Sequence, residues 1–300
     1  MAFHFCPQCG TKLQPDFKFC PACGEKLTCP EALGAIASTL SPSKTSVHKG
    51  PTLSPVCEPK AGKSKKTKAI PALEPLLEGT DVTDTNGKKW KLVRLLSHGA
   101  KDGKIFNEQN FLQRAAKPAS SKWVKQHKMD FIGLPQCIGF GLHANSYRFL
   151  VFPNMGHSLQ SLMNNQNTLL SEVTVLQLAC RLLDILVYIH SNEYIHADIN
   201  AENVYINQGQ GSQVYLVGYN HAFRYCPGGH HVEYREGSRT PNEGAVESIS
   251  LDCHSGAAPS RRSDLQSLGY CMLYWHTGTL PWTTLSQPEH IAAEKRRYDN

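Results

Sequence analysis

Two closely spaced cysteine pairs near the N-terminus constrain the fold of this chain more than any other feature. They form two C-x-x-C-G knuckles separated by ten residues. Two intervening residues let both thiolates of a knuckle reach one metal ion, and the glycine permits the turn behind them. Four thiolates close a zinc tetrahedron and leave no position for a catalytic water. The spacing predicts a structural zinc ribbon over residues 1–28, with the ligands Cys6, Cys9, Cys20 and Cys23.

The alternatives for these pairs are a redox-active dithiol and chance spacing. The chain has 11 cysteines, which would suggest disulfides in a secreted protein. However, the first residues show neither the basic start nor the apolar core of a signal peptide. No apolar stretch approaches the roughly 18 residues that a membrane span needs. We therefore expect no membrane insertion, and reduced thiols outside the zinc ribbon.

Residues 29–72 are rich in Ser, Thr, Pro and Lys and nearly free of aromatic residues. This composition predicts a disordered linker between two folded parts. The formal net charge of the chain is +6, and five lysines between Lys60 and Lys68 account for most of it. Because the rest of the chain sums to only about +1, no basic folded face is evident. Nucleic acid is therefore not an expected partner.

The lysine tract itself has the density of a nuclear localisation signal. It predicts nuclear accumulation, with some cytoplasmic protein, through an import receptor that binds Lys63, Lys65, Lys66 and Lys68. The alternative is a solvated linker that its own charge keeps extended.

Apolar periodicity begins near Leu73 and continues to the end of the chain. Alternation predicts strands over 90–96, 147–152, 204–206 and 214–217, and helical spacing predicts helices over 106–116 and 264–275. The clearest helix follows Ser171, a good N-cap, and its predicted buried stripe is Val175, Leu178, Ala179, Leu182, Leu186 and Ile189. Strands that come first and helices that come later predict an α+β domain with two lobes over residues 73–300.

The segment His196-Ala197-Asp198-Ile199-Asn200-Ala201-Glu202-Asn203 follows this long helix. It has the H-x-D-x-x-x-x-N arrangement of a protein kinase catalytic loop. In an active kinase the aspartate orients and deprotonates the substrate hydroxyl, and the asparagine binds magnesium. The structural alternative is that His196 is a packed core histidine and that Asp198 and Asn203 only hold the loop together.

Further strings accompany this loop, namely Phe106-Asn107-Glu108, Phe223-Arg224-Tyr225-Cys226 and the run RRSDLQSLGYCM over residues 261–272. Together they resemble the vaccinia-related kinase family, over residues 1–28 and about 76–300. The zinc ribbon and the lysine-bearing linker make the chain most similar to the catalytically inactive branch of that family. The resemblance implies a protein-kinase-like bilobal fold. It also implies a nuclear pseudokinase that acts as a scaffold and regulates a signalling enzyme, with a phosphatase or a kinase as partner.

The nucleotide-binding parts of a kinase are missing from the expected places. The chain passes from Trp90 to Glu108 in 18 residues with only Gly99 and Gly103 between them. This leaves no room for a G-x-G-x-x-G loop and the following lysine strand. We therefore predict an incomplete N-lobe sheet, and a Glu108 without an ion-pair partner.

Two substitutions compound this loss. Gly218 stands where the metal-binding aspartate belongs, and Asn200 stands where active members of the resembled family carry a lysine for the γ-phosphate. Asp198, Asn203 and Glu108 are thus predicted to be vestigial, and so are the residues at the hinge positions, Phe152 and Met155. Zinc is the expected cofactor, whereas ATP and magnesium are not expected.

Two other functions stay open from the sequence. The retained kinase residues allow a weakly active Ser/Thr protein kinase of the vaccinia-related type. The zinc ribbon allows a nucleic-acid-binding protein, which the charge distribution disfavours. Asp264 opens a predicted helix and is interpreted as a structural cap of the catalytic loop. Since the sequence given stops at Asn300, soon after Pro281-Trp282, we expect a truncated helical C-lobe.

Overall fold

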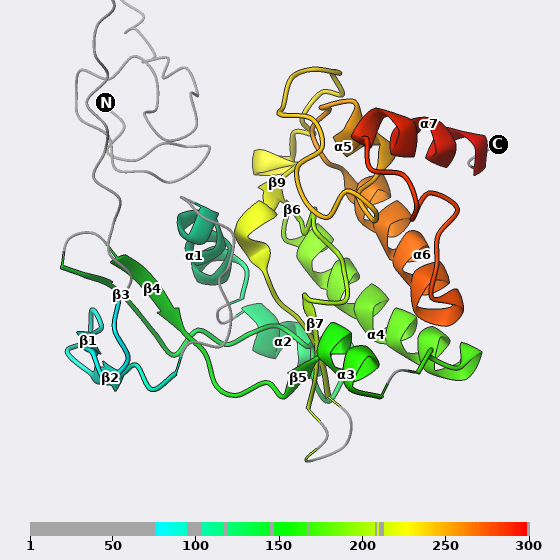
Figure 1. The fold of residues 1–300 in the computed structure, drawn as a ribbon. Helices are drawn as coiled ribbons and strands as arrows, with labels where there is room; N and C mark the ends of the chain where they lie inside the picture. The colour runs from blue at the N-terminus through cyan, green and yellow to red at the C-terminus, as the bar shows by residue number, and fades with distance from the viewer. Residues whose placement is uncertain are drawn as a thin grey trace, which may run out of the picture.

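The computed structural model describes residues 76–94, 104–116, 119–144, 147–166, 168–207, 209 and 213–298. The predicted zinc ribbon and linker lie outside the described residues. The described part forms two lobes, a small one built mainly of strands and a larger one built mainly of helices (Figure 1). This is the α+β, kinase-like arrangement that the order of elements predicted.

The small lobe contains two antiparallel hairpins. β1 (Asp81–Thr83) pairs with β2 (Lys89–Lys91), and β3 (Gly139–His143) pairs with β4 (Tyr147–Val151). A hydrogen bond of 2.9 Å from the Thr85 amide to the Phe140 carbonyl joins the two hairpins. The Asp84 carboxylate closes the first turn, because it accepts hydrogen bonds from the Asn86 and Lys88 amides and from the Trp90 indole.

The strand predicted over 90–96 is wrong in its extent, because β2 ends at Lys91. β1 offers only three residues for pairing, and the chain before it turns at Gly79. Leu92 still exchanges hydrogen bonds with Gly79 and Thr80, but Val93 is 79% exposed. Residues 95–103 lie outside the described residues.

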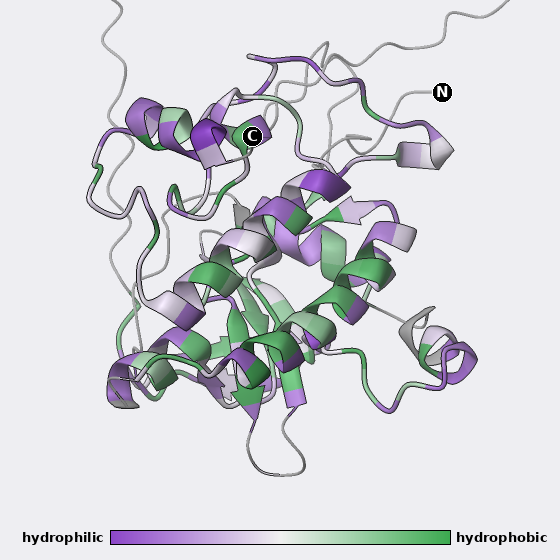
Figure 2. Ribbon diagram, turned by 90° about the vertical axis from the view of Figure 1, so that its right-hand side faces the viewer, coloured by the Kyte–Doolittle hydropathy of each residue, from purple (hydrophilic) through white to green (hydrophobic). Residues whose placement is uncertain are grey.

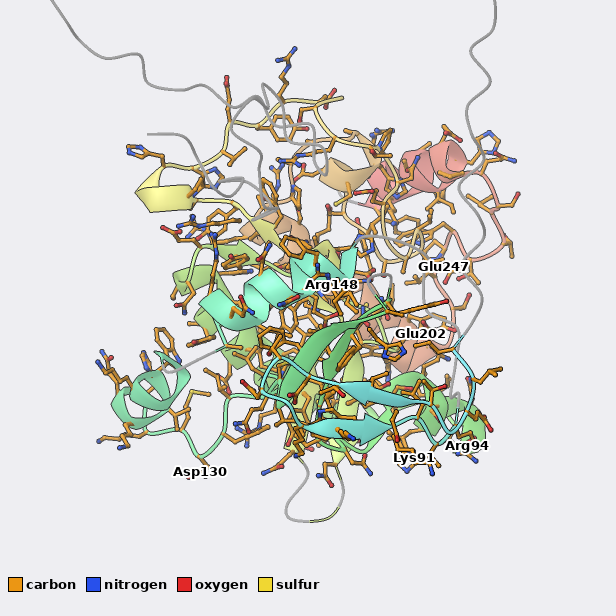
Figure 3. The ribbon with its side chains drawn as sticks, turned by 90° about the vertical axis from the view of Figure 1, so that its left-hand side faces the viewer. Lys91, Arg94, Asp130, Arg148, Glu202 and Glu247 are labelled. Carbon is orange, nitrogen blue, oxygen red and sulfur yellow. The ribbon has the colours of Figure 1, made fainter. Side chains whose placement is uncertain are left out.

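Two helices connect the hairpins, α1 (Lys104–Arg114) and α2 (Ala119–Gln126). α1 confirms the helix predicted over 106–116, and Phe111, Leu112 and Ala115 are buried on its inner face. Arg148 on β4 reaches back to this helix (Figure 3), where its guanidinium donates to Gln109 Oε1 at 2.9 Å. α1 is therefore held against the β3–β4 hairpin.

The larger lobe begins with β5 (His157–Ser158) and α3 (Leu159–Gln166). β5 joins β7 (Val204–Asn207) and β8 (Gln213–Leu216) in a three-stranded sheet of order β5-β7-β8. β6 (Tyr194–Ile195) pairs with β9 (Phe223–Arg224). The strands predicted over 147–152, 204–206 and 214–217 are all present within a residue or two.

The central helix α4 (Glu172–Ser191) confirms the strongest prediction. The Ser171 side chain caps it by accepting a hydrogen bond from the Thr174 amide. All six residues of the predicted stripe are buried. By length and mean hydropathy (1.6), α4 is apolar enough to cross a membrane, which corrects the statement that no stretch approaches such a length. Because its stripe lies in the protein core, we interpret it as a core helix.

The remaining helices are α5 (Leu251–His254), α6 (Arg261–Thr277) and α7 (Pro288–Tyr298), with short 3-10 turns η1 (Tyr219–His221) and η2 (Pro227–Gly229). α6 begins three residues before the predicted start at Asp264, because the Ser260 amide donates to Ser263 Oγ and starts the first turn earlier. Gly278, with φ of 75°, ends α6. The largest core cluster unites α1, α4, α6 and the β7–β8 pair, so both lobes share one hydrophobic core.

Candidate functional site

The kinase-like catalytic loop lies between β6 and β7. One buried carboxylate, that of Asp264, accepts hydrogen bonds from the backbone of the loop. Asp264, near the start of α6, has no exposed surface. It accepts hydrogen bonds from the amides of His196 and Ala197, both at 2.9 Å, and from His190 Nε2 at 2.8 Å. Ala197 has a φ of 65°, a conformation that L-residues adopt only when the surroundings hold them there. The structural role predicted for Asp264 is confirmed.

His196 is a packed histidine and not an exposed acid–base group. Its Nε2 donates to the Val217 carbonyl at 2.8 Å, and its Nδ1 accepts from the Asp198 amide at 3.2 Å. One donor and one acceptor define a neutral ring. Burial lowers the pKa of His196, which agrees with that neutral state.

The carboxylate of Asp198 accepts three hydrogen bonds from groups of the protein. Its Oδ1 accepts from Asn200 Nδ2 and from the Ala245 amide, each at 3.2 Å. Its Oδ2 accepts from Asn203 Nδ2 at 3.1 Å. The residue that would act as catalytic base thus holds together the loop and the segment that contains Ala245.

Asn200 also turns inward. Its Oδ1 accepts from the Glu202 amide at 2.9 Å and from the Asn203 amide at 3.2 Å, while its Nδ2 donates to Asp198. Both ends of the Asn200 side chain are thus used within the loop. Position 200 therefore carries an amide that caps the turn of the loop, in place of the lysine expected in an active member of the family.

Gly218 is the position where a metal-binding aspartate is expected, and the backbone around it does not suit one. Its φ is 78°, and a Cβ built there would lie 2.3 Å from Asn203 Oδ1 and 2.6 Å from Asn203 Cγ. The side chain of Asn203, which donates 2.8 Å to the Asp198 carbonyl, therefore occupies the space next to the Gly218 Cα. The two positions that bind magnesium in an active kinase thus lie in contact with each other here.

The side chain of Glu108 on α1 binds the backbone of the same segment. Its Oε1 accepts from the Tyr219 amide at 3.3 Å, and burial raises its pKa. Among the described residues no lysine or arginine forms an ion pair with it, and residues 95–103, where a lysine strand would lie, are not described. Glu108 thus binds the chain that follows Gly218.

α1 is fastened to this segment by further contacts. Asn107 Nδ2 donates to the carbonyls of Asn220 and Ala222, at 3.0 and 2.6 Å. The rings of Phe111 and Tyr219 stack with centroids 3.8 Å apart. Among the described residues the buried Tyr219 hydroxyl has no hydrogen-bond partner, a feature that sequence reasoning missed because no local pattern marks it.

The two vestigial hinge residues lie in the segment that connects β4 to β5. Phe152 packs against the main core cluster, and Met155 is partly buried. Both positions agree with their interpretation as core and loop residues. Within the described ranges, no group of three or more His, Cys, Asp and Glu side chains could hold a metal ion.

Two lobes, a β6–β9 pair and a catalytic loop capped by a buried aspartate define a protein-kinase fold. Comparison with known proteins identifies the family. The chain is 44% identical over 306 aligned positions to "Serine/threonine-protein kinase VRK3" of Mus musculus, covering 89% of this chain and 68% of the relative. It is 47% identical over 260 positions to the Homo sapiens protein of that name, covering 76% and 55%. The chain belongs to the vaccinia-related kinase family.

Two further comparisons agree. A solved "Structure of vaccinia related kinase 3" superimposes with a TM-score of 0.72 at 48% identity, covering 76% of this chain and 77% of that one. A zinc-ribbon domain family matches residues 5–27, which supports structural zinc. The chain spans between about half and two thirds of the length of the VRK3 relatives it matches.

We expect one zinc ion per chain, bound by Cys6, Cys9, Cys20 and Cys23, which lie outside the described residues. Elemental analysis of the purified protein should give a zinc-to-protein ratio near one. Substituting both cysteines of the second knuckle, Cys20→Ser/Cys23→Ser, should release the metal, because two thiolates rarely retain a structural zinc. A Cys29→Ser variant is the matched control and should keep its zinc. Absence of zinc from the wild type, or its full retention in the double variant, would contradict the assignment.

Proposed function

We propose that this protein is a pseudokinase, a nuclear scaffold that binds and regulates a signalling enzyme without transferring phosphate. The observation that carries this proposal is the contact between Asn203 and Gly218. In a kinase, the corresponding asparagine and aspartate hold the metal ions that bridge the phosphates. Here the asparagine amide fills the space where the aspartate side chain would begin, and no carboxylate is supplied in its place.

The energetic argument supports the same conclusion. Phosphoryl transfer depends almost entirely on positioning and on neutralising phosphate charge. Losing one preorganised electrostatic contact typically costs about 3 kcal/mol, or roughly a hundredfold in rate. Three such contacts are missing here. They are an aspartate at position 218, a lysine at position 200 and the lysine strand whose absence the sequence predicts. Even partial additivity makes turnover negligible.

The lengths of the alignments support the predicted loss of the glycine loop and its lysine strand. The alignment with the human relative runs over 260 positions but covers 76% of the 300 residues here, or about 228. About 32 positions of the relative therefore face no residue of this chain. Two strands of about six residues with a short connecting loop account for about half of such a difference.

A weakly active Ser/Thr kinase is the second candidate, because the relatives are named as serine/threonine kinases and Asp198, Asn203 and Glu108 are present. The two functions differ in their response to Asp198→Ala. We expect neither wild type nor Asp198→Ala to transfer radiolabelled phosphate from Mg-ATP to a generic basic protein. The substitution should only lower stability, by about 1–2 kcal/mol, the usual cost of a lost buried partner.

An independent arm is a thermal-shift titration with Mg-ATP, in which the melting temperature of the wild type should stay constant. An active vaccinia-related kinase serves as positive control for both assays. Transfer by the wild type that disappears in Asp198→Ala would establish the kinase function and overturn the pseudokinase proposal.

Nuclear localisation belongs to the same proposal and rests on the lysine tract. Replacing Lys63, Lys65, Lys66 and Lys68 by alanine should distribute a fluorescent fusion, made large enough to prevent passive diffusion, through the cytoplasm. Replacing Lys88, Lys89, Lys91 and Arg94, exposed cations of the small lobe, is the matched control and should leave the signal nuclear. An unchanged nuclear signal in the first variant would refute the role of the tract. The proposed partner, a signalling phosphatase or kinase, is sought by affinity capture from nuclear extract.

A further inference from the structure

Two exposed arginines from separate segments of the chain lie over neighbouring aromatic rings. The guanidinium carbon of Arg239 is 4.5 Å from the centroid of the Phe223 ring in β9, and that of Arg261 is 5.5 Å from the centroid of the Tyr225 ring. Phe223 and Tyr225 are two residues apart, the spacing at which side chains of an extended chain share a face, and both rings belong to one buried cluster. Arg239 and Arg261 are here named the β9 arginine pair.

The nitrogen donors of the pair are not used by the part of the chain that the structure describes. Within that part, neither guanidinium donates a hydrogen bond or forms an ion pair, and each contacts only its aromatic ring. The neighbouring arginines differ, because Arg224 pairs with Glu193 and Arg262 donates to Asp252 at 2.7 Å. Each guanidinium carries five N–H donors in a planar fork that matches the oxygens of an anion. The pair is thus a set of donors that lacks an acceptor among the described residues.

The backbone fixes the positions of both arginines. The Arg239 amide donates to the Gly256 carbonyl at 2.8 Å. Gly256 has a φ of 63°, and a Cβ built there would lie 2.6 Å from the Arg239 carbonyl oxygen, so this close approach requires a glycine. Arg261 is the first residue of α6, whose start is fixed by the hydrogen bonds between Ser260 and Ser263. Because both side chains are already placed, a ligand loses less free energy in ordering them.

His231 adds a third nitrogen-bearing side chain to the same rings. Its ring meets that of Tyr225 edge-on, with centroids 5.2 Å apart, and its Nδ1 donates to the Val232 carbonyl at 2.8 Å. Its Nε2 has no hydrogen-bond partner among the described residues. A solitary exposed arginine is normally solvated, but here three such side chains from different segments gather on two rings.

The surface beside the pair is hydrophilic and of mixed charge. The loop that follows β9 lies at the top of the larger lobe in Figure 1, and the same region is mostly purple in the side view of Figure 2. Glu233 and Glu236 on this loop are exposed, and Asp252 lies against Arg262, the residue after Arg261. The positive surface is therefore a small spot with acidic residues nearby. Such a spot suits a single anionic group better than a long polyanion such as nucleic acid.

We propose that the β9 arginine pair binds the phosphate of a phosphorylated serine or threonine in a peptide segment of a partner protein. A phosphate ester carries a charge of about −1.5 to −2 and three acceptor oxygens, so one group can neutralise both guanidiniums. A carboxylate carries a single charge and would neutralise only one of them. Arginine clusters are a recurring means of recognising phosphorylated peptides. The site lies outside the catalytic loop, so the proposal does not depend on the pseudokinase assignment.

The first test measures peptide binding to the full chain by fluorescence anisotropy. The probe is a fluorescein-labelled pool of short peptides with a fixed central phosphothreonine, and the same pool without phosphate should bind at least about tenfold more weakly. Arg239→Gln and Arg261→Gln should each weaken binding of the phosphorylated pool by about tenfold, because each removes a charge-assisted fork. The matched control is Arg181→Gln on α4, which changes an arginine with 68% of its side chain exposed and should bind like the wild type. Circular dichroism checks that each variant is folded.

The second test separates the sources of the phosphate. Inorganic phosphate should displace the labelled pool only at concentrations at least about a hundredfold above the dissociation constant of the pool, because it lacks the peptide contacts. Displacement at equal concentration would show a site for free phosphate and overturn the peptide assignment. A single-stranded oligonucleotide that binds as tightly as the phosphorylated pool would also overturn it.

Two results of the first test would overturn the proposal. One is no binding of the phosphorylated pool at about 0.5 mM, where even a weak specific site is partly filled. The other is binding that is unchanged in both glutamine variants. Phosphate transfer is not a readout here, so failure of this proposal and failure of the pseudokinase assignment are distinguishable.

Discussion

Replacing Asp264 by alanine is expected to lower the free energy of unfolding of the kinase-like region by about 3–5 kcal/mol, the usual cost of breaking a buried hydrogen-bond network. Asp264 is fully buried and accepts three hydrogen bonds. Removing it leaves the amides of His196 and Ala197 buried without acceptors, at about 1–3 kcal/mol each. The same amides hold Ala197 at its positive φ, so the loop also loses the contact that fixes its conformation.

The measurement is chemical unfolding followed by circular dichroism, with thermal unfolding in parallel. For a region of this size, each kcal/mol corresponds to about 2–4 °C in melting temperature. The matched control is Asp184→Ala, since the side chain of Asp184 is 48% exposed and its loss should change stability by less than about 0.5 kcal/mol. A loss below 1 kcal/mol for Asp264→Ala would show that the loop is held by other contacts.

Hydrogen bonds among its own residues hold the catalytic loop of this protein together. Asp198, Asn200 and Asn203 hydrogen-bond to one another and to nearby backbone groups, and Asn203 packs against Gly218. Restoring an aspartate at position 218 would place its Cβ 2.3 Å from the Asn203 amide oxygen. An aspartate at position 218 would therefore require the Asn203 side chain to move.

Features with a local physical cause were predictable from the sequence. The bounds of α4 follow from the Ser171 cap and the 3.6-residue stripe, both written in adjacent residues. The positions of the catalytic loop and of Asp264 follow from motif spacing, and the structure places them in contact. The residue types at positions 218 and 200 mark the departures from the kinase pattern, but the neighbouring sequence does not show that the Asn203 side chain lies next to Gly218.

Features set by distant partners were not predictable. β2 is shorter than predicted because its partner β1 has only three residues, which alternation within 90–96 cannot reveal. Lys295 looks like one cation of a solvated C-terminal helix, yet it is fully buried. Its acceptors are 41 to 49 residues away along the chain. Such a burial depends on tertiary contacts that no sequence period encodes.

Lys295 joins α7 to α5 and to the segment before it by three hydrogen bonds. Its ammonium donates to the carbonyls of Val246 and Ile249 at 2.8 Å, and to His254 Nε2 at 3.1 Å. His254 can accept because its Nδ1 donates to Asn242 Oδ1 at 2.7 Å. The rings of Tyr270 and Trp282 lie 5.0 and 5.4 Å from the lysine nitrogen.

Replacing Lys295 by alanine should lower the free energy of unfolding by about 3–4 kcal/mol at pH 7. The substitution leaves two buried carbonyls without a donor and creates a cavity in the aromatic surroundings. Arg297→Ala, on the exposed side of α7 with 76% of its side chain accessible, is the matched control and should cost less than about 0.5 kcal/mol. Equal effects of the two substitutions would refute the role of Lys295.

The pH dependence of this loss separates the lysine's charge from simple packing. Burial lowers the pKa of Lys295 to about 7; burial, with the charges of Lys295 and Arg296, lowers the pKa of His254 to about 4. The other groups that act on the lysine are Glu247, Cys253 and Cys271. Where a folded-state pKa is lowered, the unfolded chain binds more protons, so stability rises with pH.

For Lys295 this window runs from about pH 7 to its ordinary value of 10.5, and for His254 from about 4 to 6.5. The wild type gains stability across both windows. The alanine variant lacks the lysine entirely, and its His254 no longer faces the lysine's charge, so it gains less. The difference between wild type and Lys295→Ala should therefore grow from pH 5 to pH 9, by about 2 kcal/mol between pH 7 and 9 alone. Denaturant unfolding of both proteins at pH 5, 7 and 9 measures it. A constant difference would mean that Lys295 acts by filling space and that its proton is bound equally in both states.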